Sequence, residues 1–154
     1  MAETFEITGG KELEALAGRL ARVPAAARTQ LRTRMHAVGA PMKSSVQTHA
    51  LAIPVHGEAA TGLRRSIAAA TKVRTTVTPE SVSVRVEVDP KAMPPGQEKL
   101  PALMESAGWT HEVFGRKDTV FQPGHAYFKP AVDPYLPIMQ RAVESAITEA
   151  TRTI

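Results

Sequence analysis

Residues 72–88 read KVRTTVTPESVSVRVEV and form the clearest strand pattern in the chain. Valines alternate with polar residues on both sides of Pro79-Glu80, and such alternation is typical of a half-buried strand. Proline suits the second position of a type I turn. The stretch therefore predicts a β-hairpin over 72–88 whose valine face must be covered by another layer.

Helical periodicity precedes this hairpin. Residues 10–53 are predicted to be helical, because apolar side chains recur there at spacings of three and four residues. Pro41 interrupts the pattern and has no N–H to donate, so we expect a kink or break in the helix there. His49 falls on the apolar stripe and is expected to be a core residue.

A second apolar stripe, from Leu136 to Ala150, predicts a C-terminal helix over 133–152. Asp133-Pro134 has the residue types of an N-cap and a first helical position. With the hairpin, these helices indicate an α+β fold in which helices pack on one face of a small, mainly antiparallel sheet.

The chain of 154 residues is expected to be a single domain, 1–154, with a core of its own. "TFEITGG" near its start is a short possible strand. The expected organisation is a helical region 10–53, a loop 54–60, a short helix 61–70, the hairpin 72–88, a loop 89–99, a short helix 100–108, an aromatic loop 109–132 and the C-terminal helix 133–152.

Composition narrows the classes of function. There is no cysteine, which excludes disulfides, thiolate metal sites and a cysteine nucleophile. No apolar run approaches the ~20 residues of a membrane span, and the acidic start is unlike a secretory signal. Residues 1–78 hold 11 Lys/Arg against five Asp/Glu, whereas residues 79–154 hold eight against 10. A basic first half favours an acidic partner such as DNA, or is a solvated helix surface.

Enzyme motifs are missing from the sequence. None of the five histidines has a second histidine three to five residues away, so we expect no metal site and no cofactor. Ser66 lacks the glycine-flanked elbow of an exposed nucleophile. Glu105 and Glu112 could line a cleft, but two carboxylates at this spacing are common. We expect a protein without enzymatic activity.

The arginines that could face phosphate groups are the strongest indication of nucleic-acid binding in the sequence. They lie in the basic half, where there is no aromatic residue beyond Phe5, so a non-specific surface is expected rather than base readout. Solvated helix faces and salt bridges between proteins explain the same residues equally well. The candidates for a DNA-facing surface are Arg28, Arg32, Arg34, Arg64 and Arg65.

Six of the seven aromatic residues fall between Trp109 and Tyr135. Trp109 and Phe114 are expected to contribute to the core, because large rings are usually buried. The stretch "VFQPGHAYFKPAVDPY" (120–135) is rich in Pro and Gly and is expected to be an ordered, projecting loop that contacts another subunit. Its predicted contact residues are Phe121, Gln122, Pro123, His125, Tyr127 and Phe128.

Two motifs, Thr61–Ile67 ("TGLRRSI") and His111–Val132, together with the helical first third and the valine hairpin, resemble the neck and tail-completion proteins of long-tailed bacteriophages. This family is also described as head–tail joining or minor tail components. The resemblance covers about residues 25–150. The chain departs from the common family form, since Gly62 and Leu63 are adjacent and "VFGR" replaces a Glu-Phe-Gly-Thr segment.

The resemblance implies a structural virion protein that forms a ring, usually hexameric, at the head–tail junction. Its implied partners are other copies of itself, the neighbouring neck and tail-tube proteins, and DNA in the lumen. The implied location is the virion, after assembly in the host cytoplasm. The alternatives are a head-side stopper or adaptor ring of the neck, and a non-specific DNA-binding protein.

Overall fold

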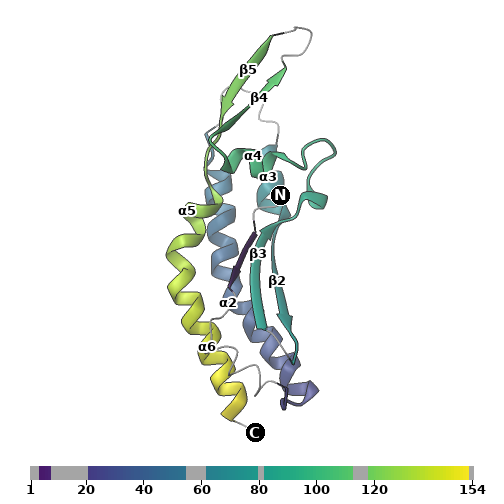
Figure 1. The fold of residues 1–154 in the computed structure, drawn as a ribbon, viewed down its shortest axis with the longest axis vertical. Helices are drawn as coiled ribbons and strands as arrows, with labels where there is room; N and C mark the ends of the chain where they lie inside the picture. Colours follow the sequence, from purple (N-terminus) through teal and green to yellow (C-terminus); the bar gives the residue numbers. More distant parts are fainter. Residues whose placement is uncertain (1–3, 8–20, 55–61, 80–81, 113–117, 153–154) are drawn as a thin grey trace.

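The computed structural model describes residues 4–7, 21–54, 62–79, 82–112 and 118–152, and its α+β architecture confirms the predicted class (Figure 1). For residues 4–7 and 151 only the backbone is described. The elements in chain order are β1 (Thr4–Ile7), α2 (Ala25–Leu51), α3 (Leu63–Ala70), β2 (Thr71–Val77), β3 (Val82–Val88), η1 (Pro90–Ala92), α4 (Leu100–Glu105), β4 (Gly108–Glu112), β5 (Thr119–Pro123), α5 (Phe128–Val132), η2 (Asp133–Tyr135) and α6 (Leu136–Arg152).

The predicted hairpin is confirmed by β2 and β3, which pair antiparallel from Thr71↔Val88 to Val77↔Val82. The short strand expected near the start is also confirmed, since β1 pairs antiparallel with β3 and completes a sheet of order β1-β3-β2. The three valines Val84, Val86 and Val88 of β3 are buried. One face of this sheet therefore belongs to the core.

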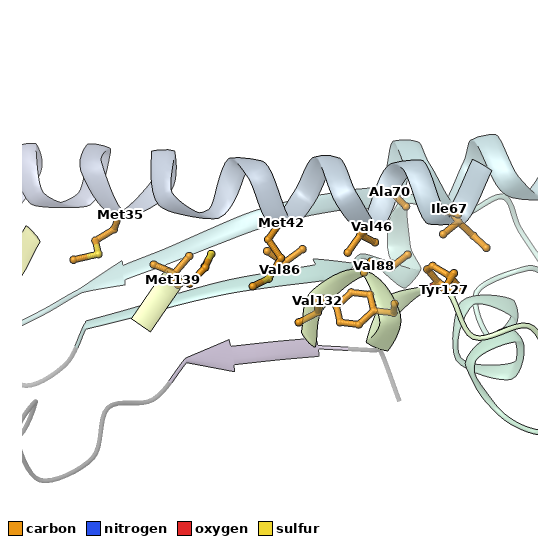
Figure 2. Close-up of a cluster of buried hydrophobic side chains, with 14 of the residues drawn as sticks. Met35, Met42, Val46, Ile67, Ala70, Val86, Val88, Tyr127, Val132 and Met139 are labelled. Carbon is orange, nitrogen blue, oxygen red and sulfur yellow. The ribbon is translucent and has the colours of Figure 1, made fainter. Parts of the chain in front are cut away.

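Helix α2 covers the valine face along its length (Figure 1). Met35, Met42 and Val46 of α2 point toward Val86 and its neighbours (Figure 2). The helix lies close to the sheet at Gly39, where an added Cβ would lie 2.6 Å from Val73 Cγ1. A glycine is therefore required by the contact between helix and sheet, not by the helix itself.

The predicted interruption at Pro41 does not occur, because α2 runs unbroken for 27 residues. A proline at this position removes the hydrogen bond to the carbonyl of Ala37. Both residues are exposed, so water can replace the missing donor while the opposite face of the helix stays packed. The expectation that His49 lies in the core is wrong: its ring is exposed, with Nδ1 2.9 Å from Ser45 O.

In the second half of the chain, the observed elements differ more from those predicted from the sequence. The predicted aromatic loop 109–132 is wrong, since it contains β4, β5 and α5. Helix α5 continues through η2 into α6, so Asp133 is not an N-cap; its carboxylate instead binds Lys129 Nζ at 2.5 Å. The two short helices are present as α3 and α4. Residues 10–20 and 55–60 of the predicted helix and loop lie outside the described residues.

The last helix completes the core by packing along α2. Met139, Val143 and Ile147 of α6 are buried. The preceding helix α5 also contacts α2, since Ser45 of α2 donates a hydrogen bond to Ala131 O of α5 at 3.0 Å. None of the described helices is long and apolar enough to cross a membrane.

The close approach at Gly39 gives the first prediction. Gly39→Leu should lower the free energy of unfolding by about 1–3 kcal/mol, because the larger side chain overpacks the contact with Val73. The gain in helix propensity on replacing glycine, about 1 kcal/mol, is included in that range. Urea unfolding followed by circular dichroism measures the change. The neighbouring exposed residue supplies the control, Ala40→Leu, which should leave stability within about 0.5 kcal/mol; equal stability of both variants would contradict the packing described here.

Candidate functional site: the β4–β5 arm

Strands β4 and β5 form an antiparallel hairpin that projects from one end of the molecule (Figure 1). We call residues 108–112 and 119–123 the arm; its tip, 113–117, lies outside the described residues. Every described arm residue except Gly108 and Trp109 is exposed. A two-stranded hairpin is only marginally stable in water by itself. The strands of the arm are therefore accessible to a partner, and a partner that covers them would stabilise the arm.

Apolar side chains lie on both faces of the arm. Phe121 is 61% exposed and Val120 is 46% exposed. They are consecutive on β5, so their side chains point to opposite faces. The register pairs Thr110 with Phe121 and His111 with Val120. The arm can therefore bury an apolar residue against a partner on either side.

Phe121 also has a structural contact within the arm. An added Cβ at Gly108 would lie 2.4 Å from Phe121 Cζ and 2.5 Å from Gln122 O. Gly108 has φ +144°, a conformation that favours glycine. One side of the Phe121 ring thus covers the glycine backbone, and the rest of the ring is presented to solvent.

The carboxylate of Glu105 anchors the chain immediately after the arm. It accepts hydrogen bonds from the backbone N–H groups of Tyr127 and Phe128, each at 2.9 Å, and of Lys129 at 2.8 Å. These are the unpaired donors at the start of α5. A carboxylate from α4 therefore caps α5, and the capping bonds are of the stronger charge-assisted kind. Glu105 is engaged in structure rather than lining a cleft.

Close backbone contact fixes the base of the arm from the other side. An added Cβ at Gly124 would lie 1.9 Å from Ser106 O. Gly124 N donates to Ala107 O at 3.3 Å, and Ser106 Oγ donates to Leu103 O at 2.6 Å. Any side chain at Gly124 would push the two segments apart. The arm therefore leaves the body at a defined angle.

The predicted contact residues divide into two groups. Phe121, Gln122 and Pro123 are exposed on β5, and His125 is half-buried. Tyr127 and Phe128 were predicted to project, and this is wrong. They are 1% and 4% exposed, and their rings meet edge to face at 6.4 Å within the core. Trp109, expected in the core, is half-buried and packs against it; Phe114 lies outside the described residues.

Sequence reasoning missed two residues of this site. Val120 was not selected, although neighbouring β-branched and aromatic residues such as Val120 and Phe121 favour a strand. Glu105 was considered only as a carboxylate that could line a cleft and was set aside, and its spacing of 22 residues from Tyr127 gives no local capping pattern. Only the tertiary arrangement brings α4 to the start of α5.

The candidate DNA-facing arginines are not one cluster. Arg64 extends back to the end of α2, where Nη1 donates to Leu51 O at 3.0 Å and Ile53 O at 3.3 Å. Arg65 next to it is exposed. Arg28, Arg32 and Arg34 lie in the first turns of α2, at the opposite end of that helix. The structure thus separates the two groups that sequence reasoning combined.

The outer face of the sheet is a layer of paired charges. Lys72 binds Asp89 and lies 3.7 Å from Glu87, which also binds Arg74. The hydrogen bond from Lys72, and then that from the backbone N–H of Lys91, lowers the pKa of Asp89. Edge strand β2 carries Lys72 and Arg74, and charged residues on an edge discourage pairing with another sheet. This face is less suited to a subunit contact than the arm.

The described residues hold no group of three or more His, Asp or Glu side chains placed to bind a metal ion. A hollow of about 450 Å³ lies between the first turns of α2 and the end of α6. Its two charged side chains, Arg34 and Glu149, are paired with each other at 2.7 Å. The arm remains the strongest candidate for a functional site.

Comparisons of the chain with protein-family models, with curated proteins and with solved structures gave no match. The fold and the arm therefore define the class on their own: an α+β domain with a projecting, firmly anchored β-hairpin.

The anchoring role of Glu105 gives the second prediction. Glu105→Ala should lower the free energy of unfolding by about 2 kcal/mol, because three backbone donors lose a charged acceptor. Urea unfolding measures the loss, and Trp109 fluorescence reports the arm, since Trp109 is the only tryptophan. Glu112→Ala, an exposed carboxylate on the arm itself, is the control and should change stability by less than about 0.5 kcal/mol. Similar losses in both variants would show that the cap is not the cause.

Proposed function

We propose that this chain is a structural subunit that assembles through its arm into a ring, hexameric in the form we favour, at the head–tail junction of a long-tailed bacteriophage. The ring completes or terminates the tail and surrounds the DNA channel, without enzymatic activity or a cofactor. One observation carries the proposal: the arm is exposed, its base is fixed to the body, and Val120 and Phe121 lie on its opposite faces.

The contacts that the arm makes within its own chain support the proposal of self-assembly. Its base is fixed by Glu105 and Gly124, while β4 and β5 pair only with each other within the described residues. A partner that covers the arm removes apolar surface from water without the entropy cost of ordering a flexible loop. A projecting arm that fits a different surface on the next copy makes a head-to-tail contact, and such contacts form a ring when the rotation from one copy to the next closes on itself.

The phage assignment rests on the sequence resemblance. The motif Thr61–Ile67 contains the first five residues of α3, and the motif His111–Val132 spans most of the arm and α5. The second motif therefore coincides with the arm and with the helix that follows its base, which supports a use of this segment in assembly. In this proposal the neighbours of the ring are neck and tail-tube proteins, and the protein acts in the virion after assembly in the host cytoplasm.

Two other functions are weighed against this one. A head-side stopper or adaptor ring would use the same arm and differ only in its position along the neck. A non-specific DNA-binding protein would use the arginines at the start of α2 and would not need the arm. The arm therefore favours ring assembly over free DNA binding as the main function.

Native mass spectrometry of the full chain tests assembly. The wild-type protein should form a closed oligomer of defined mass, and Phe121→Asp should raise the concentration for half-assembly at least tenfold, because a buried charge replaces an apolar contact. Ile138→Asp is the matched control, since Ile138 is an exposed apolar residue of α6 away from the arm. It should assemble like the wild type.

A wild-type chain that stays monomeric at about 100 µM, a concentration that supports even weak interfaces, would overturn the proposal. Equal weakening by Phe121→Asp and Ile138→Asp would show that the arm is not the contact. Binding of the labelled oligomer to purified tails, compared with filled heads, separates the tail-side position from the head-side alternative.

A further inference from the structure

Five arginines gather at the end of the molecule opposite the arm. The first turns of α2, the end of β2 and the end of α6 meet there (Figure 1). Arg32 Nη2 donates to Val77 O of β2 at 3.4 Å, and Arg34 Nη1 lies 2.7 Å from Glu149 Oε2 of α6. We call this group the arginine end; it consists of Arg22, Arg28, Arg32, Arg34 and Arg152.

The charged side chains at the arginine end are almost all positive. The described residues 21–34, 76–79, 82–84 and 146–152 contain these five arginines, no lysine and a single acid, Glu149. Four of the arginines are exposed and Arg28 is half-buried. The arginine end therefore attracts anions.

This arrangement is unfavourable for the isolated chain. Helix N-termini favour acids, yet α2 has none in its first turn and carries Arg28 and Arg32 in its first two turns. Like charges four residues apart on a helix repel each other. Packing of the valine face needs none of these charges. An anionic partner is the simplest physical reason for concentrating them here.

We infer that the arginine end binds the phosphate backbone of duplex DNA without reading its sequence. Guanidinium groups match phosphate oxygens in a two-pronged geometry. The same residue ranges contain no aromatic side chain to stack on a base, so the contact is electrostatic. The inference rests on the proposed function, in which DNA passes through the ring, and it assigns the DNA-facing part of the subunit to Arg22, Arg28, Arg32, Arg34 and Arg152. Arg64 and Arg65 lie at the other end and are not part of it.

Binding of a 30-base-pair duplex to the full chain, measured by fluorescence anisotropy between 50 and 200 mM salt, tests this assignment. The double variant Arg28→Gln with Arg152→Gln should reduce the slope of log K against log salt by about 1.8, which is about 0.9 for each lost phosphate contact. The matched control, Arg65→Gln with Lys99→Gln, removes the same charge near the arm and should leave the slope unchanged. Two duplexes of unrelated sequence should bind equally.

A variant that is expected to increase the affinity for DNA provides a second test. Glu149→Gln removes the one acid of the arginine end and frees Arg34 from its exposed ion pair, which contributes little stability. Its affinity for the duplex should rise about threefold or more, with no loss of thermal stability. A mutation that merely disturbed the fold would not strengthen binding.

The outcomes separate this inference from the proposed function, because the mass of each sample is measured in the same buffer. A wild-type oligomer that does not bind the duplex at 50 mM salt overturns the inference alone. An equal reduction of the salt slope in both double variants also overturns the inference. Tighter binding of a polyglutamate peptide than of the duplex overturns it too and points to an acidic protein as the partner. A chain that never assembles overturns the proposed ring, and the duplex affinities and salt slopes of the same samples then decide the inference separately.

Discussion

The valine face of the β1-β3-β2 sheet has to be covered, and one long helix does most of this. Helix α2 can lie close to the sheet because Gly39 leaves room for the side chains of Val73 and Val84. Once α2 is placed, α5 and α6 pack beside the sheet along the same apolar face of α2, and the buried side chains of sheet and helices meet there (Figure 2). A long helix on a narrow sheet gives an elongated body, and an elongated body has two ends that can differ in chemistry.

The end that carries the arm depends on a contact between residues far apart in the sequence. The Glu105 carboxylate holds the start of α5, so the chain that leaves β5 is drawn straight into the core at Tyr127 and Phe128. Without that cap, the Gly- and Pro-rich stretch after Phe121 would have many conformations. Buried aromatic residues on one side and a charge-assisted cap on the other turn this stretch into a rigid support for the arm.

Periodic features were predictable from sequence, and features set by distant contacts were not. Alternating valines gave the β2–β3 hairpin, and apolar stripes gave α2 and α6, because these patterns are local. Tyr127 and Phe128 were misplaced because Pro and Gly around them are equally typical of a projecting loop and of a tight turn into the core. Arg64 was grouped with the other arginines because its sequence neighbours do not show that it reaches the carbonyls that end α2. His49 fits the apolar stripe in sequence, yet it is exposed in the structure.

In the proposed ring the two ends of the subunit would use different physical forces, and this would allow them to work independently. Contacts of the arm would bury apolar surface, which strongly hydrated salts reinforce. Contacts of the arginine end would be electrostatic. Salt weakens such contacts, because at 0.1 M it screens exposed charges that lie more than about 10 Å apart. A ring subunit built this way can hold its neighbours firmly while its hold on DNA stays weak and independent of sequence. That combination suits a channel through which DNA has to slide, because tight or sequence-specific contacts would stop its movement.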